Sequence, residues 1–135
     1  IDKFPSFVER RKENFQYLYE RLEKLGEKLI LPTACPGSDP SWFGFLITCK
    51  EGTDRNSLVR GLEEQGIQTR MLFAGNLTKH PCFDEMRSLG KGYRIVGSLE
   101  NTDRIMRDSF WIGVYPGMTK EMLDCMADRI IELCS

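Results

Sequence analysis

The segment WFGFLITC, residues 42–49, decides the fold because two sets of side chains alternate along it. In an extended chain successive side chains point to opposite sides. One side would hold Phe43, Phe45, Ile47 and Cys49, and the other Trp42, Gly44, Leu46 and Thr48. This alternation predicts a strand that packs its first side into the protein, and a glycine on the second side indicates a close neighbour there.

Helices are predicted both before and after this strand in the sequence. Upstream, residues 6–26 carry apolar side chains near a 3.6-residue period, and Ser6 and Glu9 have capping-box spacing, which predicts a long helix ending near Gly26. The stretch LPTACPGSDPS, residues 31–41, contains three prolines and is predicted to be a loop. Downstream, a capped helix is predicted from about Asp54 to Gln65, stopping at Gly66. Its buried residues are expected to be Leu58, Val59 and Leu62.

The second half of the chain also carries strand and helix patterns. IQTRMLF, residues 67–73, alternates with Ile67, Thr69, Met71 and Phe73 on one side and Gln68, Arg70 and Leu72 on the other. A short helix holding Phe83 and Met86 is expected next, then a glycine-bounded connection at 90–97 with a few strand residues, and a helix capped by Asn101 or Thr102. SFWIGVYPG predicts a strand ending at Pro116-Gly117, and Thr119 is predicted to cap a last helix through about Leu133. The inward residues of that helix are expected to be Leu123, Met126, Ile130 and Leu133.

This order of elements predicts an α/β fold of the α+β type, with a small sheet of about three strands and helices packed on one face. Residues 1–135 have enough apolar material for one domain. The other face would carry Trp42, Leu46, Arg70 and Leu72, which is too apolar for solvent. We therefore expect a partner surface over it, and a first residue Ile1 that leads at once into a helix indicates a chain cut from something larger.

Composition excludes several classes of function. The chain has 19 Lys and Arg against 20 Asp and Glu, so no net field favours nucleic acid or anionic lipid. No apolar run approaches the roughly 18 residues of a membrane span, and the first 25 residues are a charged amphipathic segment, not a signal peptide. The five cysteines have neither disulfide-framework nor zinc spacing, which predicts reduced thiols in the cytoplasm.

RMLFAGNLTKHPCF, residues 70–83, places Lys79, His80 and Cys82 within four residues. A cysteine beside a histidine can form a nucleophilic thiolate. However, alternate residues of a strand diverge, Pro81 fixes a turn, and no third residue orients the pair. The pattern favours a turn histidine beside a half-buried cysteine over a hydrolase, and no metal site is predicted.

Arg70 is the more informative residue. On the uncovered face, near Asn76 and Lys79, its guanidinium would form a donor array for a phosphate or carboxylate. An ordinary edge-strand arginine fits the same pattern. Trp111 and Tyr115 are similarly either core aromatics or ligand walls, and the pattern alone names no reaction.

GIQTRMLFAGNLTKHPCF, residues 66–83, and NTDRIMRDSFWIGVYPGMT, residues 101–119, resemble the carboxy-terminal part of the CDP-4-keto-6-deoxyglucose-3-dehydrases of lipopolysaccharide biosynthesis. These enzymes are a branch of the sugar aminotransferases with the aspartate-aminotransferase fold. The resemblance covers nearly the whole chain. It implies that residues 1–135 are the C-terminal small domain of a larger fold-type I enzyme, with residues 1–26 as its first helix, and that the full-length protein is a homodimer.

The resemblance also implies a cofactor, a substrate and partners. Pyridoxamine or pyridoxal 5'-phosphate would be held by the large domain and not by this chain, and would act as electron sink while the 3-hydroxyl of CDP-4-keto-6-deoxyglucose leaves. A separate reductase would complete the 3-deoxygenation. Some of these enzymes carry an iron–sulphur cluster through closely spaced cysteines; the cysteines here match no such spacing, so any ligands would lie outside this chain. Phe43 follows Trp42 where related aminotransferases often have Trp-His, which favours dehydration over amino transfer.

The implied role of this chain is to cover the substrate and exclude water, with no catalytic residue of its own. Arg70 and Asn76 are expected to contact the nucleotide or sugar, and Phe43, Phe73 and Tyr115 to form apolar walls, with Lys79 and His80 as further candidates. The isolated chain is expected to be inactive. Two alternatives stay open: the small domain of a sugar aminotransferase, and a self-sufficient small-molecule-binding α/β module.

Overall fold

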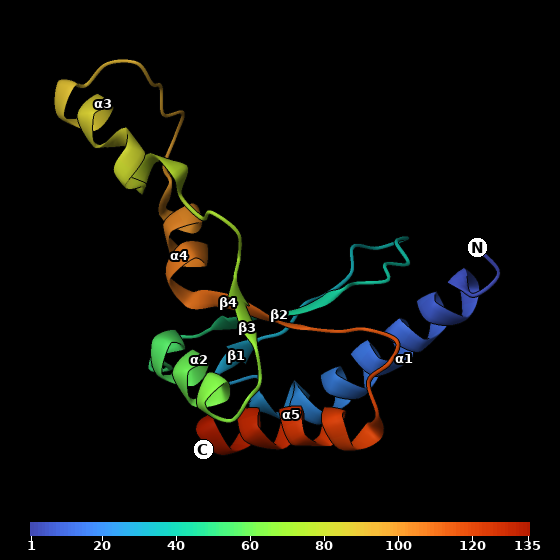
Figure 1. Cartoon of the computed structure of the whole chain (residues 1–135). Helices are drawn as coiled ribbons and strands as arrows, with labels where there is room; N and C mark the ends of the chain where they lie inside the picture. The colour runs from blue at the N-terminus through green and yellow to red at the C-terminus, as the bar shows by residue number, and fades with distance from the viewer.

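The computed structural model describes residues 1–135 as a small sheet, a layer of helices and a projecting segment (Figure 1). The helices are α1 (Phe4–Leu22), α2 (Arg55–Glu64), α3 (Asp84–Leu89), α4 (Glu100–Asp108) and α5 (Lys120–Leu133). The strands are β1 (Leu29–Ile30), β2 (Gly44–Cys49), β3 (Thr69–Met71) and β4 (Ser109–Gly113). Single 3-10 turns cover Glu23–Leu25, Leu77–Lys79 and Pro81–Phe83.

The sheet is antiparallel throughout, in the order β1-β2-β4-β3. Its central pair places Gly44 of β2 opposite Gly113 of β4, and the hydroxyls of Thr48 and Ser109 lie 2.8 Å apart across the same pair. The predicted fold class is confirmed, with one more strand than expected. β1 has only two residues, which is too short to show an alternation in the sequence.

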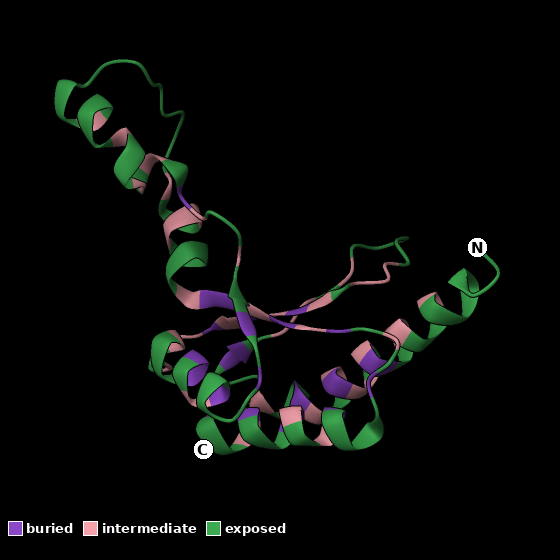
Figure 2. Ribbon diagram, viewed as in Figure 1, coloured by how far each residue is buried: buried purple, intermediate pink, exposed green.

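The core lies between the sheet and the helices α1, α2 and α5, which all cover the same face (Figures 1 and 2). Phe45 of β2 and Phe110 of β4 are fully buried and form its centre. The predicted inward residues of α2 are buried. In α5, Leu123 and Ile130 are buried and Met126 is partly buried, whereas Leu133 is exposed and Ala127 is a buried residue that the pattern missed. Helices on one face are therefore confirmed.

Two of the four predicted helix caps are present. The Asp54 carboxylate accepts hydrogen bonds from the backbone N–H groups of Asn56 and Ser57, and the Thr119 hydroxyl accepts one from Met122. The Ser6–Glu9 capping box is wrong, because α1 already begins at Phe4 and the Ser6 hydroxyl donates to the Lys3 carbonyl. The predicted cap of α4 is also wrong, because that helix begins before Asn101, at Glu100.

The predicted strands are longer than the observed ones. The alternation over 67–73 ends at Met71, which shares the side of Thr69 as predicted but is exposed, and Phe73 leaves that pattern because its φ is +49°. Phe43 precedes β2 and contacts Trp111, not the core. β4 ends at Gly113, and residues 90–97 contain no strand.

Residues 74–108, here called the arm, leave the sheet after β3 and return at β4 (Figure 1). The arm carries α3 and α4 and projects away from the helices that cover the sheet. Asn76 is its one buried residue, and Figure 2 shows α3 and the coil after it as almost wholly exposed.

Candidate functional site

Two pockets share Trp111: one lies on the face of the sheet that no helix covers, and the other lies between the β3 edge of the sheet and α5. The first, here called the aromatic pocket, has a volume of about 320 Å³. The second, here called the edge pocket, has a volume of about 700 Å³. Its lining includes Arg70, Tyr115, Met118 and Cys125. The aromatic pocket is lined by Pro32, Thr33, Trp42, Phe43, Gly44, Leu46, Leu72, Phe73 and Trp111.

Trp111 lies flat over β2 because position 44 has no side chain. A Cβ built at Gly44 would be 2.7 Å from Cε3 of the Trp111 ring, closer than packed carbon atoms approach. The Phe43 ring meets Trp111 edge-on, with ring centroids 5.3 Å apart and planes at 90°. The glycine that the alternation singled out therefore does have a close neighbour, and that neighbour is the indole on the open face.

Phe73 stands at the end of β3, on the border of the aromatic pocket. Its φ of +49° is a left-handed conformation that bulky residues rarely adopt, and its backbone N–H donates to the Met71 carbonyl at 2.7 Å. Its side chain is 77% exposed. The turn therefore holds an aromatic ring out toward solvent at a cost in backbone energy.

The edge pocket contains Arg70 and Tyr115. Arg70 pairs with Trp111 in the β3–β4 register, and its side chain is exposed on the same face as the indole. The backbone carbonyl of Tyr115 accepts a hydrogen bond from Nδ2 of Asn14, 2.8 Å away. Asn14 is buried in α1, so this helix fixes the position of the chain that leaves β4.

Asn76, Lys79 and His80 lie together at the base of the arm, apart from the two pocket linings. Asn76 is 2% exposed, and its Nδ2 donates to Oδ1 of Asp103 at 2.6 Å. The Lys79 ammonium lies 2.8 Å from Oδ2 of the same carboxylate. Hydrogen bonds from Lys79 and Asn76 hold the pKa of Asp103 below its usual value. These bonds join the turn after β3 to α4.

The histidine and cysteine that the sequence brings together do not form a pair. The Nε2 atom of His80 lies 2.5 Å from the Ala74 carbonyl, and Cys82 is exposed in the following 3-10 turn. Cys49 is buried, which raises its pKa to about 11 and keeps it as a thiol at neutral pH. No three His, Cys, Asp or Glu side chains gather as metal ligands.

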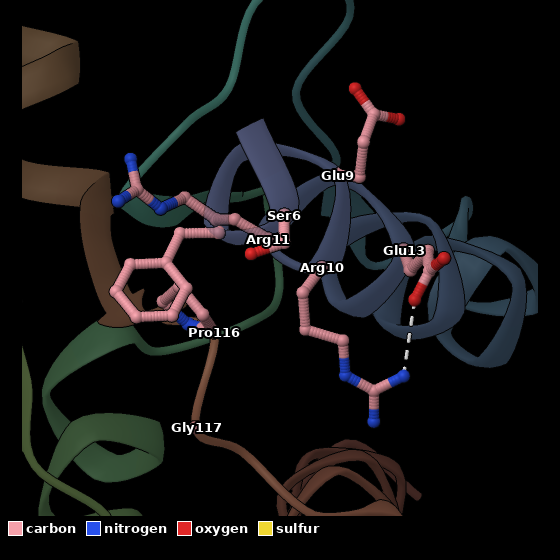
Figure 3. A pocket seen from close by; sticks show the side chains of 8 residues that line it. Ser6, Glu9, Arg10, Arg11, Glu13, Pro116 and Gly117 are labelled. Carbon is pink, nitrogen blue, oxygen red and sulfur yellow. Dashed lines mark hydrogen bonds and ion pairs between the residues drawn. The ribbon is translucent and has the colours of Figure 1, made fainter. Parts of the chain in front are cut away.

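A third hollow, about 720 Å³ and open, lies between the N-terminal end of α1 and the turn after β4 (Figure 3). It contains none of the predicted site residues. Arg10 is paired with Glu13 at 3.1 Å, the ion pair drawn in Figure 3, and NH1 of Arg11 donates to the Ser41 carbonyl at 3.3 Å. The charges of this hollow are therefore largely satisfied within the chain.

Alternation placed Arg70 on the open face, and the resemblance named Phe43, Phe73 and Tyr115 as apolar walls. The structure distributes these four residues over two adjoining pockets. Sequence reasoning missed Asp103 and left Trp111 undecided. Asp103 lies 27 residues from Asn76 along the chain, and no local pattern reports a contact of that span. For Trp111 there was a signal, the glycine in the neighbouring strand.

The fold occurs in sugar-modifying enzymes of known structure. The chain superposes with a TM-score of 0.80 on an E. coli GDP-4-keto-6-deoxy-D-mannose-3-dehydratase with bound hydrated PLP, at 22% identity, covering 96% of this chain and 32% of that one. It also superposes with a TM-score of 0.80 on the S. venezuelae protein DesV, at 20% identity, covering 99% and 33%. This fold is thus shared by a sugar dehydratase and by an aminotransferase, TlmJ of Streptoalloteichus hindustanus.

Residues 1–131 match the DegT/DnrJ/EryC1/StrS aminotransferase family, and the chain belongs to this family. It is 50% identical over 134 residues to the lipopolysaccharide biosynthesis protein RfbH of Salmonella typhimurium, covering 98% of this chain and 30% of that protein. It is 44% identical over 134 residues to a dTDP-4-dehydro-2,6-dideoxy-D-glucose 3-dehydratase of Saccharopolyspora spinosa, covering 98% and 28%. The chain thus spans about 30% of the length of these curated relatives.

The described residues do not by themselves fit the pyridoxal phosphate that this family implies. The cofactor needs a lysine or its replacement and a partner for its ring nitrogen in one pocket. The linings of the aromatic and edge pockets include no lysine, and Glu121 is their one carboxylate. An iron–sulphur cluster is not supported either, since the five cysteines are separate free thiols. No helix has the length and apolar character that a membrane crossing requires.

Proposed function

We propose that this chain is the substrate-covering, C-terminal part of a nucleotide-sugar 3-dehydratase that uses pyridoxamine phosphate. The substrate proposed is CDP-4-keto-6-deoxyglucose, in the formation of 3,6-dideoxyhexoses for O-antigen. The 50% identity to RfbH over 98% of this chain is the observation that carries the proposal. The assignment of residues 1–135 to one small domain of a larger enzyme is part of the same proposal.

The geometry is consistent with a covering role. The open face carries exposed aromatic rings and a guanidinium, and Glu121 is the one carboxylate in the linings of the two pockets. Such a face binds and orients a ligand and excludes water from it, and the chemistry then requires other groups. We propose that the full-length enzyme supplies those groups, binds the cofactor and forms a homodimer. A separate reductase is proposed to act with it.

The test uses the full-length enzyme that would contain this chain, loaded with pyridoxamine phosphate and given CDP-4-keto-6-deoxyglucose. We expect loss of the 3-hydroxyl, detected by mass spectrometry of the sugar, and no dependence on glutamate. The isolated 135-residue chain is expected to bind no cofactor and to show no turnover. Turnover by the isolated chain would contradict the covering role.

A second candidate is the corresponding part of a sugar aminotransferase, which the family description favours. Amino transfer from glutamate to the 4-keto sugar by the full-length enzyme would support it and refute dehydration. The third alternative, a self-sufficient binding module, predicts tight binding of an amino acid to the isolated chain. Calorimetric titration with CDP-hexose, CDP and amino acids separates it from the other two.

A further inference from the structure

We propose that residues 93–96 of the arm form an added β-strand against a sheet edge in the part of the full-length enzyme that lies outside residues 1–135. In β-strand addition, an extended segment pairs its backbone with the free edge of a sheet. This inference rests on the proposed function, because it takes the chain as the C-terminal part of a larger enzyme. It deepens that function by naming the segment of the arm that the rest of the enzyme binds.

The first argument is the backbone of the coil between α3 and α4. None of the N–H and C=O groups of residues 92–97 forms a hydrogen bond to another backbone group. The ends of the coil, in contrast, are held: the Lys91 N–H donates to the Met86 carbonyl, and the Ser98 hydroxyl accepts a hydrogen bond from the Glu100 N–H. Such a row of unpaired backbone groups is a template on which another strand can pair.

The second argument is the side chains of this coil. Tyr93, Ile95 and Val96 are of the residue types enriched in strands, and they are 43%, 46% and 74% exposed. The sequence predicted a few strand residues between Gly90 and Gly97, but the chain gives this segment no neighbouring strand. A strand pattern that is exposed and unpaired indicates that its pairing edge lies outside the chain.

The third argument is that the arm has little packing of its own. α3 has 6 residues and α4 has 9, and isolated helices shorter than about 12–15 residues are marginal in water. None of the core residues lies in the arm. The arm outside the coil exposes further large apolar side chains, which are Leu77, Met86, Leu89, Ile105 and Met106. Apolar surface gathered in this way marks an interaction surface, so we infer that another part of the enzyme covers the arm.

The fourth argument identifies that part. The free edges of this chain's own sheet are β1, with two residues, and β3, with three, so a second copy of residues 1–135 offers few backbone groups for a strand to pair with. The chain spans about 30% of the length of its curated relatives, so most of such an enzyme lies outside it. The arm and the N-terminal end of α1 both extend away from α2 and α5 (Figure 1). The preceding part of the polypeptide, which the proposed function joins to α1, is therefore on the side toward which the arm projects.

The test measures hydrogen exchange in the full-length enzyme without substrate, by mass spectrometry with fragmentation to single amides. At a sheet edge, only alternate residues of the added strand point their N–H groups at the neighbouring strand. We therefore expect two alternate amides of residues 93–96 to exchange about tenfold or more slowly than in an unstructured peptide, and the other two to exchange fast. The 135-residue chain alone lacks the pairing edge, so all four amides are expected to exchange fast there.

Proline at adjacent positions provides a matched pair of variants. Proline lacks an N–H and is tolerated in a strand only where that N–H points away from the neighbour. Arg94→Pro and Ile95→Pro are therefore expected to differ, one abolishing the slow exchange and the other leaving it unchanged. Neither residue belongs to the core, so both variants should keep the denaturation midpoint of the unmodified enzyme.

Cross-linking from Lys91 identifies the partner. In a mixture of subunits labelled with light and heavy nitrogen, we expect cross-links from Lys91 to lysines outside residues 1–135 of the same subunit. Cross-links between light and heavy subunits would overturn the inference and assign the coil to contact with a second copy.

Fast exchange of all four amides in the full-length enzyme would also overturn it. Equal effects of the two proline variants would do the same, because they would indicate burial without strand pairing. The result is separable from the reaction. An aminotransferase with alternate slow amides would refute the proposed function and support the added strand, whereas a dehydratase in which all four amides exchange fast would do the reverse.

Discussion

At the scale of single residues, the Asp103 carboxylate holds the base of the arm together. Its two carboxylate oxygens have different partners, the amide of Asn76 at 2.6 Å and the ammonium of Lys79 at 2.8 Å. Asn76 in turn accepts hydrogen bonds from the backbone N–H and the hydroxyl of Thr78. The turn after β3 is thus fixed by side chains, and Asp103 is the member that belongs to α4.

Replacing Asp103→Asn tests this role. The new amide keeps an oxygen for Asn76 but loses the charge that attracts Lys79. We expect faster hydrogen exchange at the amide of Lys79, measured by NMR, with the denaturation midpoint unchanged because the arm contributes no core residue. Asp39→Asn is the control, since Asp39 pairs with Lys12 at 2.6 Å in the loop before β2, outside the arm. Equal effects of the two variants on that amide would contradict the assignment.

The lowered pKa of Asp103 gives a pH dependence of defined sign. Hydrogen bonds from Lys79 and Asn76 favour the carboxylate, so the pKa is below the ordinary value of 3.8. The stabilisation of the turn after β3 by this carboxylate is therefore fully present above pH 3.8 and is lost as pH falls through the depressed pKa. We expect the carboxyl carbon of Asp103 and the side-chain amide of Asn76 to titrate together in NMR spectra, with a midpoint below 3.8. A midpoint above that value would contradict the hydrogen-bonded geometry.

At the scale of elements, the β2–β4 pair contains two glycines in facing positions with opposite tolerance for a side chain. A Cβ at Gly44 would meet the Trp111 ring, whereas a Cβ at Gly113 would have nothing within 4 Å. Gly44→Ala is expected to lower the free energy of unfolding by about 1–3 kcal/mol, because it overpacks the strand against the indole. Gly113→Ala is the matched control and is expected to be neutral. Urea denaturation followed by tryptophan fluorescence measures both, and equal midpoints would contradict the packing of Trp111.

The sequence predicted some elements better than others. The well-predicted ones are determined by residues that lie close together along the chain. α2 has a cap, a period and a terminating glycine within 13 residues, and all three signals held. β3 was predicted too long, because the turn at Phe73 breaks a strand pattern that the sequence alone continues. The faces of Arg70 and Leu46 followed from alternation, whereas the burial of Asn76 depends on Asp103, which no period connects to it.

At the scale of the whole molecule, the chain consists of a packed body and the arm. The 18 residues of the core all lie outside residues 74–108. β4 returns from the arm to pair with both β2 and β3, and α5 packs on α1 within the body. The body is therefore held by contacts between its first and last thirds. The arm joins it through the chain at 73–75 and 108–109 and through Arg55 of α2, whose Nε donates to the Arg107 carbonyl at 2.9 Å.

Limited proteolysis tests this division. Lys91 and Arg94 lie in the exposed coil between α3 and α4, whereas Lys28 and Lys50 are joined by a backbone hydrogen bond inside the body. We expect the first internal cut by trypsin after Lys91 or Arg94, identified by mass spectrometry, because proteases need an exposed, locally flexible backbone. The two fragments should then remain associated with native tryptophan fluorescence, since β4 and α5 stay packed on the elements before the cut. Lys91→Gln/Arg94→Gln should delay that cut, and a first cut at Lys28 or Lys50 would contradict the division into body and arm.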